Sequence, residues 1–172
     1  MLEGFDLGAT ASHCVSLGVQ EEYRQSEVAE AVALAGISII TLPQTNLYLQ
    51  GRDRPVSTPR GLTAIAALRR AEVNLAAGAD NLQDPFNLVG KGDPLETAAL
   101  LVMAAHYLPP AAYEAVSTAS RKAMGLPPVC IEPGSPAELM AVPASSVREA
   151  IASQPAGRIV IHAGRVVFPF SR

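Results

Sequence analysis

In the first part of the chain, segments with apolar residues at consecutive positions alternate with a segment whose apolar residues recur at helical spacing. A short apolar run at 8–17 precedes residues 20–36, where apolar side chains recur at helical spacing up to Gly36. Residues 37–42, ISIITL, are apolar and β-branched at consecutive positions, which is typical of a strand buried on both faces of a parallel sheet. The pattern therefore predicts a strand, a helix that ends near Gly36, and a second strand.

The same cycle repeats once more. Residues 43–61 are polar and contain several prolines, which predicts a long loop after Pro43 ends the second strand. LTAIAALRRAE at 62–72 has the apolar spacing of a helix, and VNLAAGAD at 73–80 predicts a third strand. Strands that alternate with helices form right-handed βαβ units. The expected fold class is therefore α/β with a parallel sheet.

The amino-acid composition changes in the last quarter of the chain, where Pro, Gly and Ser become frequent between short apolar segments. The remaining predicted elements are helices at 94–108, 110–126 and 145–154 and a hairpin at 158–168 around the turn HAGR. This change predicts two regions, residues 1–126 and a small β-rich appendage at 127–172.

Charge and composition narrow the functional classes. The 172 residues carry 13 basic and 16 acidic side chains, a net charge of −3, without a basic run. A nucleic-acid partner is therefore not expected. The longest strongly apolar stretch, at 98–105, is far shorter than the roughly 18–20 residues that span a bilayer, so no membrane partner is expected either. Two cysteines without metal-type spacing and no signal-like start suit a cytoplasmic protein.

The candidate chemistry lies where the predicted strands end. His13 and Asp80 follow two of these strands, and ligands of parallel α/β sheets bind beyond the carboxyl ends of the strands. A His and Asp pair suits metal ligation or general acid and base catalysis. A catalytic metal normally takes three or more protein ligands, and no HxH, HExxH or CxxC motif supplies them. The alternative is structural: Asp80 caps a turn and His13 is a half-buried histidine with its hydrogen bonds satisfied.

Three segments resemble the later half of the cytosine-deaminase-like branch of the amidohydrolase superfamily. They are ASHCVSLG, TLPQTNLYLQGRDRPVSTPRGLTAI and AGADNLQDPFNLVGKGDPLETAALLVMAAH. IEPGSPAEL at 131–139 is similar to the segment where the chain of that family returns to a small β-sandwich. The resemblance implies a (β/α)8 TIM barrel of which residues 1–126 supply the last three strands and helices. It also implies that residues 127–172 are part of the β-sandwich.

The resemblance also implies an activity and a site. The family hydrolyses C–N bonds of small nitrogen heterocycles, including deamination, with a bound iron or zinc whose water attacks an sp² ring carbon. Asp80 matches the aspartate that contacts the metal and takes the proton of that water, and His13 matches the histidine that polarises the water. The matching segments that line the substrate side contribute Asn46, Gln50, Asn81 and Phe86.

Some positions depart from the family pattern. Ala79, Asn81 and Phe86 stand where bacterial cytosine deaminases carry a histidine, an aspartate and a tryptophan, so the resemblance leaves the substrate ring unassigned. A complete barrel needs about 250 residues, and the first five βα units, with most metal ligands, have no counterpart here.

Two explanations of this shortness stay open. The sequence is a piece of a longer protein, through truncation, gene splitting or a start other than Met1, or another chain completes the barrel. In the second case the partner is a complementing chain or a further copy of this one, and the chain is a catalytically inactive subunit by itself. Exposed strand edges and an apolar sheet face would then make the isolated chain marginally stable.

Overall fold

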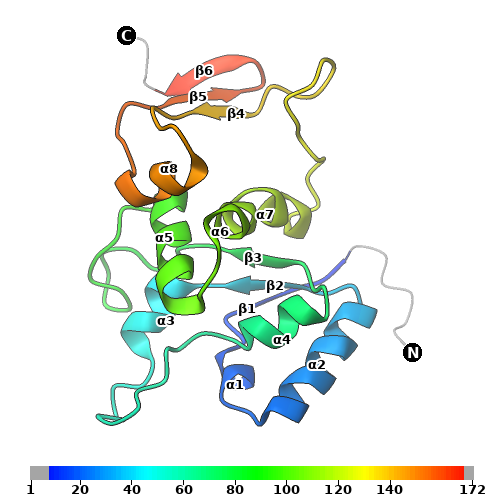
Figure 1. Cartoon of the computed structure of the whole chain (residues 1–172), viewed down its shortest axis with the longest axis vertical. Helices are drawn as coiled ribbons and strands as arrows, with labels where there is room; N and C mark the ends of the chain where they lie inside the picture. Colours follow the sequence, from blue (N-terminus) through cyan, green and yellow to red (C-terminus); the bar gives the residue numbers. More distant parts are fainter. Residues whose placement is uncertain (1–7, 169–172) are drawn as a thin grey trace.

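The computed structural model describes residues 8–168 (Figure 1). Residues 1–7 of the expected first region and 169–172 of the expected second region lie outside the described residues. The boundary expected at residue 126 stays a prediction.

The first half of the described chain contains a three-stranded parallel sheet. It pairs β1 (Thr10–Ser12), β2 (Ser38–Thr41) and β3 (Leu75–Ala77) in the order β1-β2-β3. The connections carry α1 (Val15–Gly18) and α2 (Glu22–Leu34), then α3 (Pro43–Leu49) and α4 (Ile65–Arg70). The predicted strand–helix–strand–helix–strand order is confirmed, and the parallel pairing brings the carboxyl ends of all three strands to one edge.

The core lies between this sheet and the helices. Ile39 and Leu75 of the sheet belong to one cluster with Leu68 of α4 and Leu101 of α5 (Pro94–Ala105). Leu68 and Leu101 are fully buried. Burying a side chain of this size contributes about 1.5–3 kcal/mol. In α4 the buried face is therefore apolar and consists of Ile65, Ala67 and Leu68.

Helix α7 (Thr118–Ala123) lies across the amino-terminal ends of the strands. Its carbonyl oxygens at Ala119 and Ala123 accept hydrogen bonds from Asn74 next to β3 and from Thr10 of β1. The single helix expected at 110–126 is wrong: α6 (Pro109–Val116) ends before α7 begins, because Ser117 leaves helical geometry at φ −128° and ψ −91°.

Two more expectations are corrected at the ends of β1 and β2. The strand expected at 8–17 ends at Ser12, because left-handed backbone at the next two residues turns the chain into α1. The loop expected at 43–61 begins with α3, a helix with proline in its first turn, where the missing N–H of proline costs no hydrogen bond.

A three-stranded antiparallel sheet closes the described chain. It contains β4 (Leu139–Ala141), β5 (Ile159–His162) and β6 (Arg165–Phe168), with α8 (Val147–Ser153) between β4 and β5. The predicted hairpin is confirmed, and its turn places Ala163 and Gly164 at φ 48° and 76°, the positive values of a tight hairpin turn. In Figure 1 this sheet lies at the opposite end of the molecule from α1 and α2.

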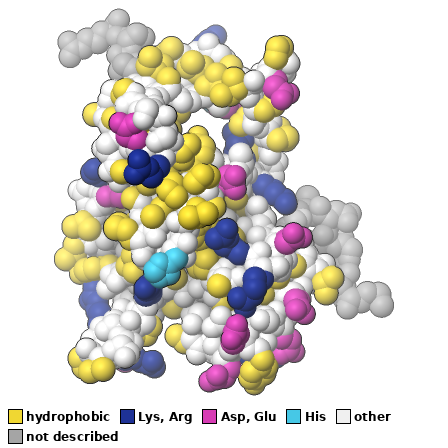
Figure 2. Space-filling view, viewed as in Figure 1, with side chains coloured by type: hydrophobic (Ala, Val, Ile, Leu, Met, Phe, Trp, Pro, Cys, Tyr) yellow, Lys and Arg dark blue, Asp and Glu magenta, His cyan; other side chains and the backbone are white. Residues whose placement is uncertain are grey.

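Charged and apolar side chains gather in different parts of one face of the molecule. Figure 2 shows acidic side chains gathered over α2 and hydrophobic side chains exposed nearer the middle of the same face. Within residues 8–168, no helix is long and apolar enough to cross a membrane.

Candidate active site

His13 and Asp80 both occupy left-handed backbone just beyond the parallel strands. Their φ angles are 63° and 66°, a region that non-glycine residues visit in only a few per cent of cases, with His and Asp among the enriched types. Such conformations cluster at functional sites because the surrounding structure must hold them in place. At both residues the positive φ ends the extended strand conformation, and both lie at the carboxyl-terminal side of the parallel sheet.

The two side chains meet beyond that edge. His13 Nε2 lies 3.7 Å from Asp80 Oδ2, and the side chains are 44% and 33% exposed. This separation is too long for a direct hydrogen bond, but a single water can contact both atoms. The sequence-based expectation that the carboxyl ends of the strands bring these residues together is met in the geometry, while their chemical role stays a prediction.

Asn46 is the second partner of the histidine. Its Oδ1 lies 3.0 Å from His13 Nδ1, and the residue is only 1% exposed. Sequence reasoning placed Asn46 on the substrate side. The structure places it in the middle of α3, buried against the Nδ1 side of the histidine ring.

Thr45 was missed by the sequence analysis. Its hydroxyl accepts a hydrogen bond from the Asn81 backbone N–H at 2.9 Å and donates one to the Ala79 carbonyl at 3.2 Å. The hydroxyl therefore bridges the peptide groups on both sides of Asp80. The available signal was Pro43, which marks the start of a helix after a strand and so places the next residues at the strand end.

The loop after Asp80 is organised by Asp84. Its carboxylate accepts hydrogen bonds from the Asn81 side-chain amide at 2.7 Å and from the backbone N–H groups of Phe86 and Asn87. The Asn81 amide, followed by these backbone donors, lowers the pKa of Asp84. The Asn81 side-chain amide therefore helps to hold this loop, and its expected contact with substrate stays a prediction.

Gln50 and Phe86 are not connected to His13 and Asp80 by side-chain hydrogen bonds among the described residues. Gln50 ends α3, and its side chain packs over Gly61. Within the described chain no side-chain hydrogen bond joins it to His13 or Asp80. Phe86 is 56% exposed, so its ring is free to stack on a planar molecule. The structure thus brings together His13, Asn46 and Asp80 of the six predicted site residues.

The residues present do not complete a metal centre. Among residues 8–168 no three His, Cys, Asp or Glu side chains gather closely enough to hold a metal ion. His13 and Asp80 offer two donors, and a catalytic zinc normally uses three protein ligands. Any resident metal would need ligands from outside the described residues.

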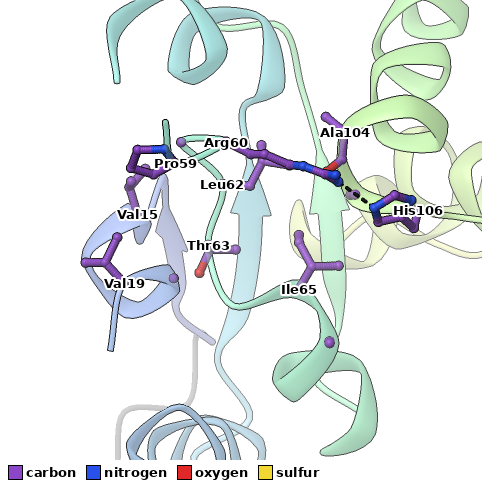
Figure 3. A pocket seen from close by; sticks show the side chains of 13 residues that line it. Val15, Val19, Pro59, Arg60, Leu62, Thr63, Ile65, Ala104 and His106 are labelled. Atoms are coloured by element: carbon purple, nitrogen blue, oxygen red, sulfur yellow. Dashed lines mark hydrogen bonds between the residues drawn. The ribbon is translucent and has the colours of Figure 1, made fainter. Parts of the chain in front are cut away.

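A separate pocket of about 310 Å³ lies beside α1 (Figure 3). There Arg60 Nη1 lies 2.6 Å from His106 Nε2 and donates a second hydrogen bond to the Ala104 carbonyl at 2.8 Å. Because arginine is always a donor, the neutral His106 ring accepts at Nε2. This contact ties the segment before α4 to the end of α5.

The sequence profile of the amidohydrolase family matches residues 4–168. A curated pterin deaminase from Rhizobium rhizogenes is 37% identical over 169 residues, which cover 95% of this chain and 38% of the relative. The chain therefore belongs to the amidohydrolase family, whose members are in general metal-dependent.

Solved structures agree with this family. A 5-methylcytosine deaminase from Klebsiella pneumoniae, liganded with 5-fluorocytosine, matches with a TM-score of 0.83 and 27% identity over 95% of this chain and 41% of that one. An N-isopropylammelide isopropylaminohydrolase from Burkholderia multivorans matches with a TM-score of 0.75 and 26% identity over 92% of this chain and 38% of that one.

The comparisons also define the extent of the fold. The chain spans about two fifths of the length of these relatives, and its parallel sheet does not close on itself. The expected partial barrel is supported at this level: an α/β fold that corresponds to one part of a TIM-barrel amidohydrolase.

Proposed function

We propose that this chain supplies the carboxyl-terminal part of a deaminase active site, in which His13 and Asp80 act on a small nitrogen heterocycle. The single observation that carries the proposal is the convergence of these two side chains, 3.7 Å apart, at the carboxyl edge of the parallel sheet. The family relationship to enzymes named as deaminases supports the reaction class.

The chemistry assigned to this chain is proton handling. Water attacks an sp² ring carbon, the new C–O bond forms, the exocyclic C–N bond breaks and ammonia leaves. Asp80 accepts a proton from the attacking water and returns one to the departing amine, while His13 Nε2 orients the water. A positioned general base of this kind contributes typically about 10²–10⁴-fold. Two donors do not constitute a metal centre, so no step through a metal is assigned to these residues.

The proposed substrate class is a ring with an exocyclic amine on a carbon next to a ring nitrogen. Pterin and 5-methylcytosine, named for two relatives, both have this feature. The exposed Phe86 ring supports stacking of such a planar ring. The higher identity to the pterin deaminase favours the bicyclic ring over the pyrimidine.

Ammonia release from pterin and cytosine tests the proposal. The chain would be assayed alone and after coexpression with the portion of the pterin deaminase that it does not match, with bound iron, zinc and manganese measured in parallel. Asp80→Asn should lower the rate at least about 100-fold, whereas Asp53→Asn, an exposed loop carboxylate, serves as the matched control. Full activity in Asp80→Asn would exclude the proposed base.

A second candidate is a non-catalytic subunit that binds a chain carrying the missing strands. The observation that favours it is the position of β1 at the outside of the described sheet, where it pairs only with β2. The backbone N–H and C=O groups on its other side can pair with a strand of another chain. The isolated chain should then be marginally stable and become more stable with its partner. A sharp, cooperative unfolding transition of the monomer would count against this candidate.

A further inference from the structure

Two consecutive side chains of α3 reach the ends of β1 and β3 where the two proposed catalytic residues lie. Thr45 bridges the peptide groups on either side of Asp80, and Asn46 meets the ring of His13. Both residues are 1% exposed, so they lie beneath the site rather than on its open side. We infer that Thr45 and Asn46 are positioning residues, Thr45 for the backbone of Asp80 and Asn46 for the ring of His13.

The case for Thr45 rests on the backbone of Asp80. With φ at 66°, the residue sits in a conformation that costs an L-amino acid roughly 1–2 kcal/mol. One hydroxyl satisfies the Asn81 N–H and the Ala79 C=O together. Without it both peptide groups would lose their partner, and the strained conformation would lose two of the contacts that hold it. Thr45 therefore fixes the direction in which the carboxylate leaves the chain.

The case for Asn46 rests on the two nitrogens of the histidine ring. Asn46 Oδ1 is an acceptor 3.0 Å from Nδ1, so the neutral ring carries its proton on Nδ1. Nε2 then has a free lone pair, and this is the nitrogen that faces Asp80 at 3.7 Å. A water between the two groups can donate to Nε2, as the proposed role of His13 requires. Which nitrogen is protonated is set by the hydrogen bond that the other one makes.

Helix α3 is itself held rigidly enough for this role. Gln44, the residue before Thr45, exchanges two hydrogen bonds with Thr97 of α5, at 2.8 and 3.2 Å. Both partners are buried, at 7% and 2% exposure. Side chains that orient a site are effective when their own conformations are locked by packing and further hydrogen bonds. The contacts therefore run from α5 through α3 to both strand ends.

The experiment measures geometry in the full chain without substrate. Nitrogen-15 NMR at alkaline pH reports which nitrogen of His13 carries the proton, and amide hydrogen exchange reports the Asn81 N–H. This inference rests on the proposed function for the importance of His13 and Asp80, but the readouts do not depend on turnover. A failure of positioning is thus distinguishable from a failure of Asp80→Asn to abolish ammonia release.

Wild type should show the Nδ1–H form of His13, and Asn46→Leu should shift the ratio of the two tautomers about fivefold towards Nε2–H, the effect of one hydrogen bond. Thr45→Val, which keeps the shape, should accelerate exchange of the Asn81 amide by about tenfold. Thr45→Ser should restore protection, and the Ile39 amide, bonded to Asn74 in the sheet, should exchange as in wild type.

Three results would overturn the inference. An Nε2–H tautomer in wild type would mean that the Asn46 amide is turned the other way and does not prepare Nε2. Unchanged exchange of the Asn81 amide in Thr45→Val would remove the role of the hydroxyl. Equal acceleration at Ile39 and Asn81, without rescue by serine, would reduce Thr45 to a general contribution to folding.

Discussion

The parallel and antiparallel sheets of this chain are buried to very different degrees. In the parallel sheet every residue of β3 and three of the four residues of β2 are buried, and only the outer strand β1 is mostly exposed. In the antiparallel sheet all four residues of β6 are exposed. Strands β2 and β3 pack against α6 and α7 and share one core with α4 and α5. The antiparallel strands find no such cover among the described residues. The contrast shows that the buried core surrounds β2 and β3, whereas the antiparallel region depends on a few attachments to it.

The attachments of the antiparallel region are few but well built. Arg158, just before β5, donates two hydrogen bonds to Asp93 at 2.8 and 2.7 Å, and both side chains are 14% exposed. Asp93 also accepts from the Leu95 N–H at the start of α5. Ile151 of α8 is 4% exposed and joins the main core. The Arg158–Asp93 ion pair and helix α8 therefore help to connect this region to the helices over the parallel sheet.

The largest effect is expected from the core of the parallel region. Leu101→Ala removes a fully buried side chain and should lower the free energy of unfolding by about 3 kcal/mol, through lost transfer energy and a cavity. Val166→Ala, in the exposed β6, is the control and should change it by less than about 0.5 kcal/mol. Urea denaturation of the full chain measures both, and equal losses would erase the contrast between the sheets.

An intermediate effect is expected at the attachment. Arg158→Ala leaves the Asp93 carboxylate unpaired and mostly buried, and should cost about 2–3 kcal/mol. Arg165→Ala, an exposed residue of β6, provides the control. Limited proteolysis should detect loosening of residues 139–168 before the parallel region. Simultaneous cleavage of both regions would show that the ion pair contributes to global stability instead.

The smallest effect is expected on the dependence of stability on pH. The hydrogen bonds from Arg158 hold the pKa of Asp93 below its ordinary value. Because the folded-state pKa is the lower one, the stabilisation is present above about pH 4, the unfolded value, and is lost as the pH falls through the folded value. Between about pH 5 and pH 3, Asp93→Asn should therefore lose less stability than wild type, by about 1 kcal/mol or less. A steeper loss in the variant would contradict the assignment.

The site shows how far sequence reasoning reaches. His13 and Asp80 were identified because each follows an apolar run, and the carboxyl ends of parallel strands share an edge. Their neighbours on α3 were harder to predict, because a polar stretch after Pro43 has the composition of a loop. Asn81 was assigned to the substrate side from the family resemblance, and the structure adds that its side-chain amide donates a hydrogen bond to Asp84 in the same loop.

The sequence by itself determined the alternation of three parallel strands with α2 and α4, the closing hairpin and the family. These follow from hydrophobic spacing within about ten residues and from motifs that are contiguous in the chain. The tertiary structure alone decided that Asn46 meets His13 across 33 positions and that Thr45 meets Asn81 across 36. It also decided that α7 lies at the amino-terminal ends of the strands and that β6 stays exposed. The physical reason is that such contacts depend on how whole elements pack, which no local pattern encodes.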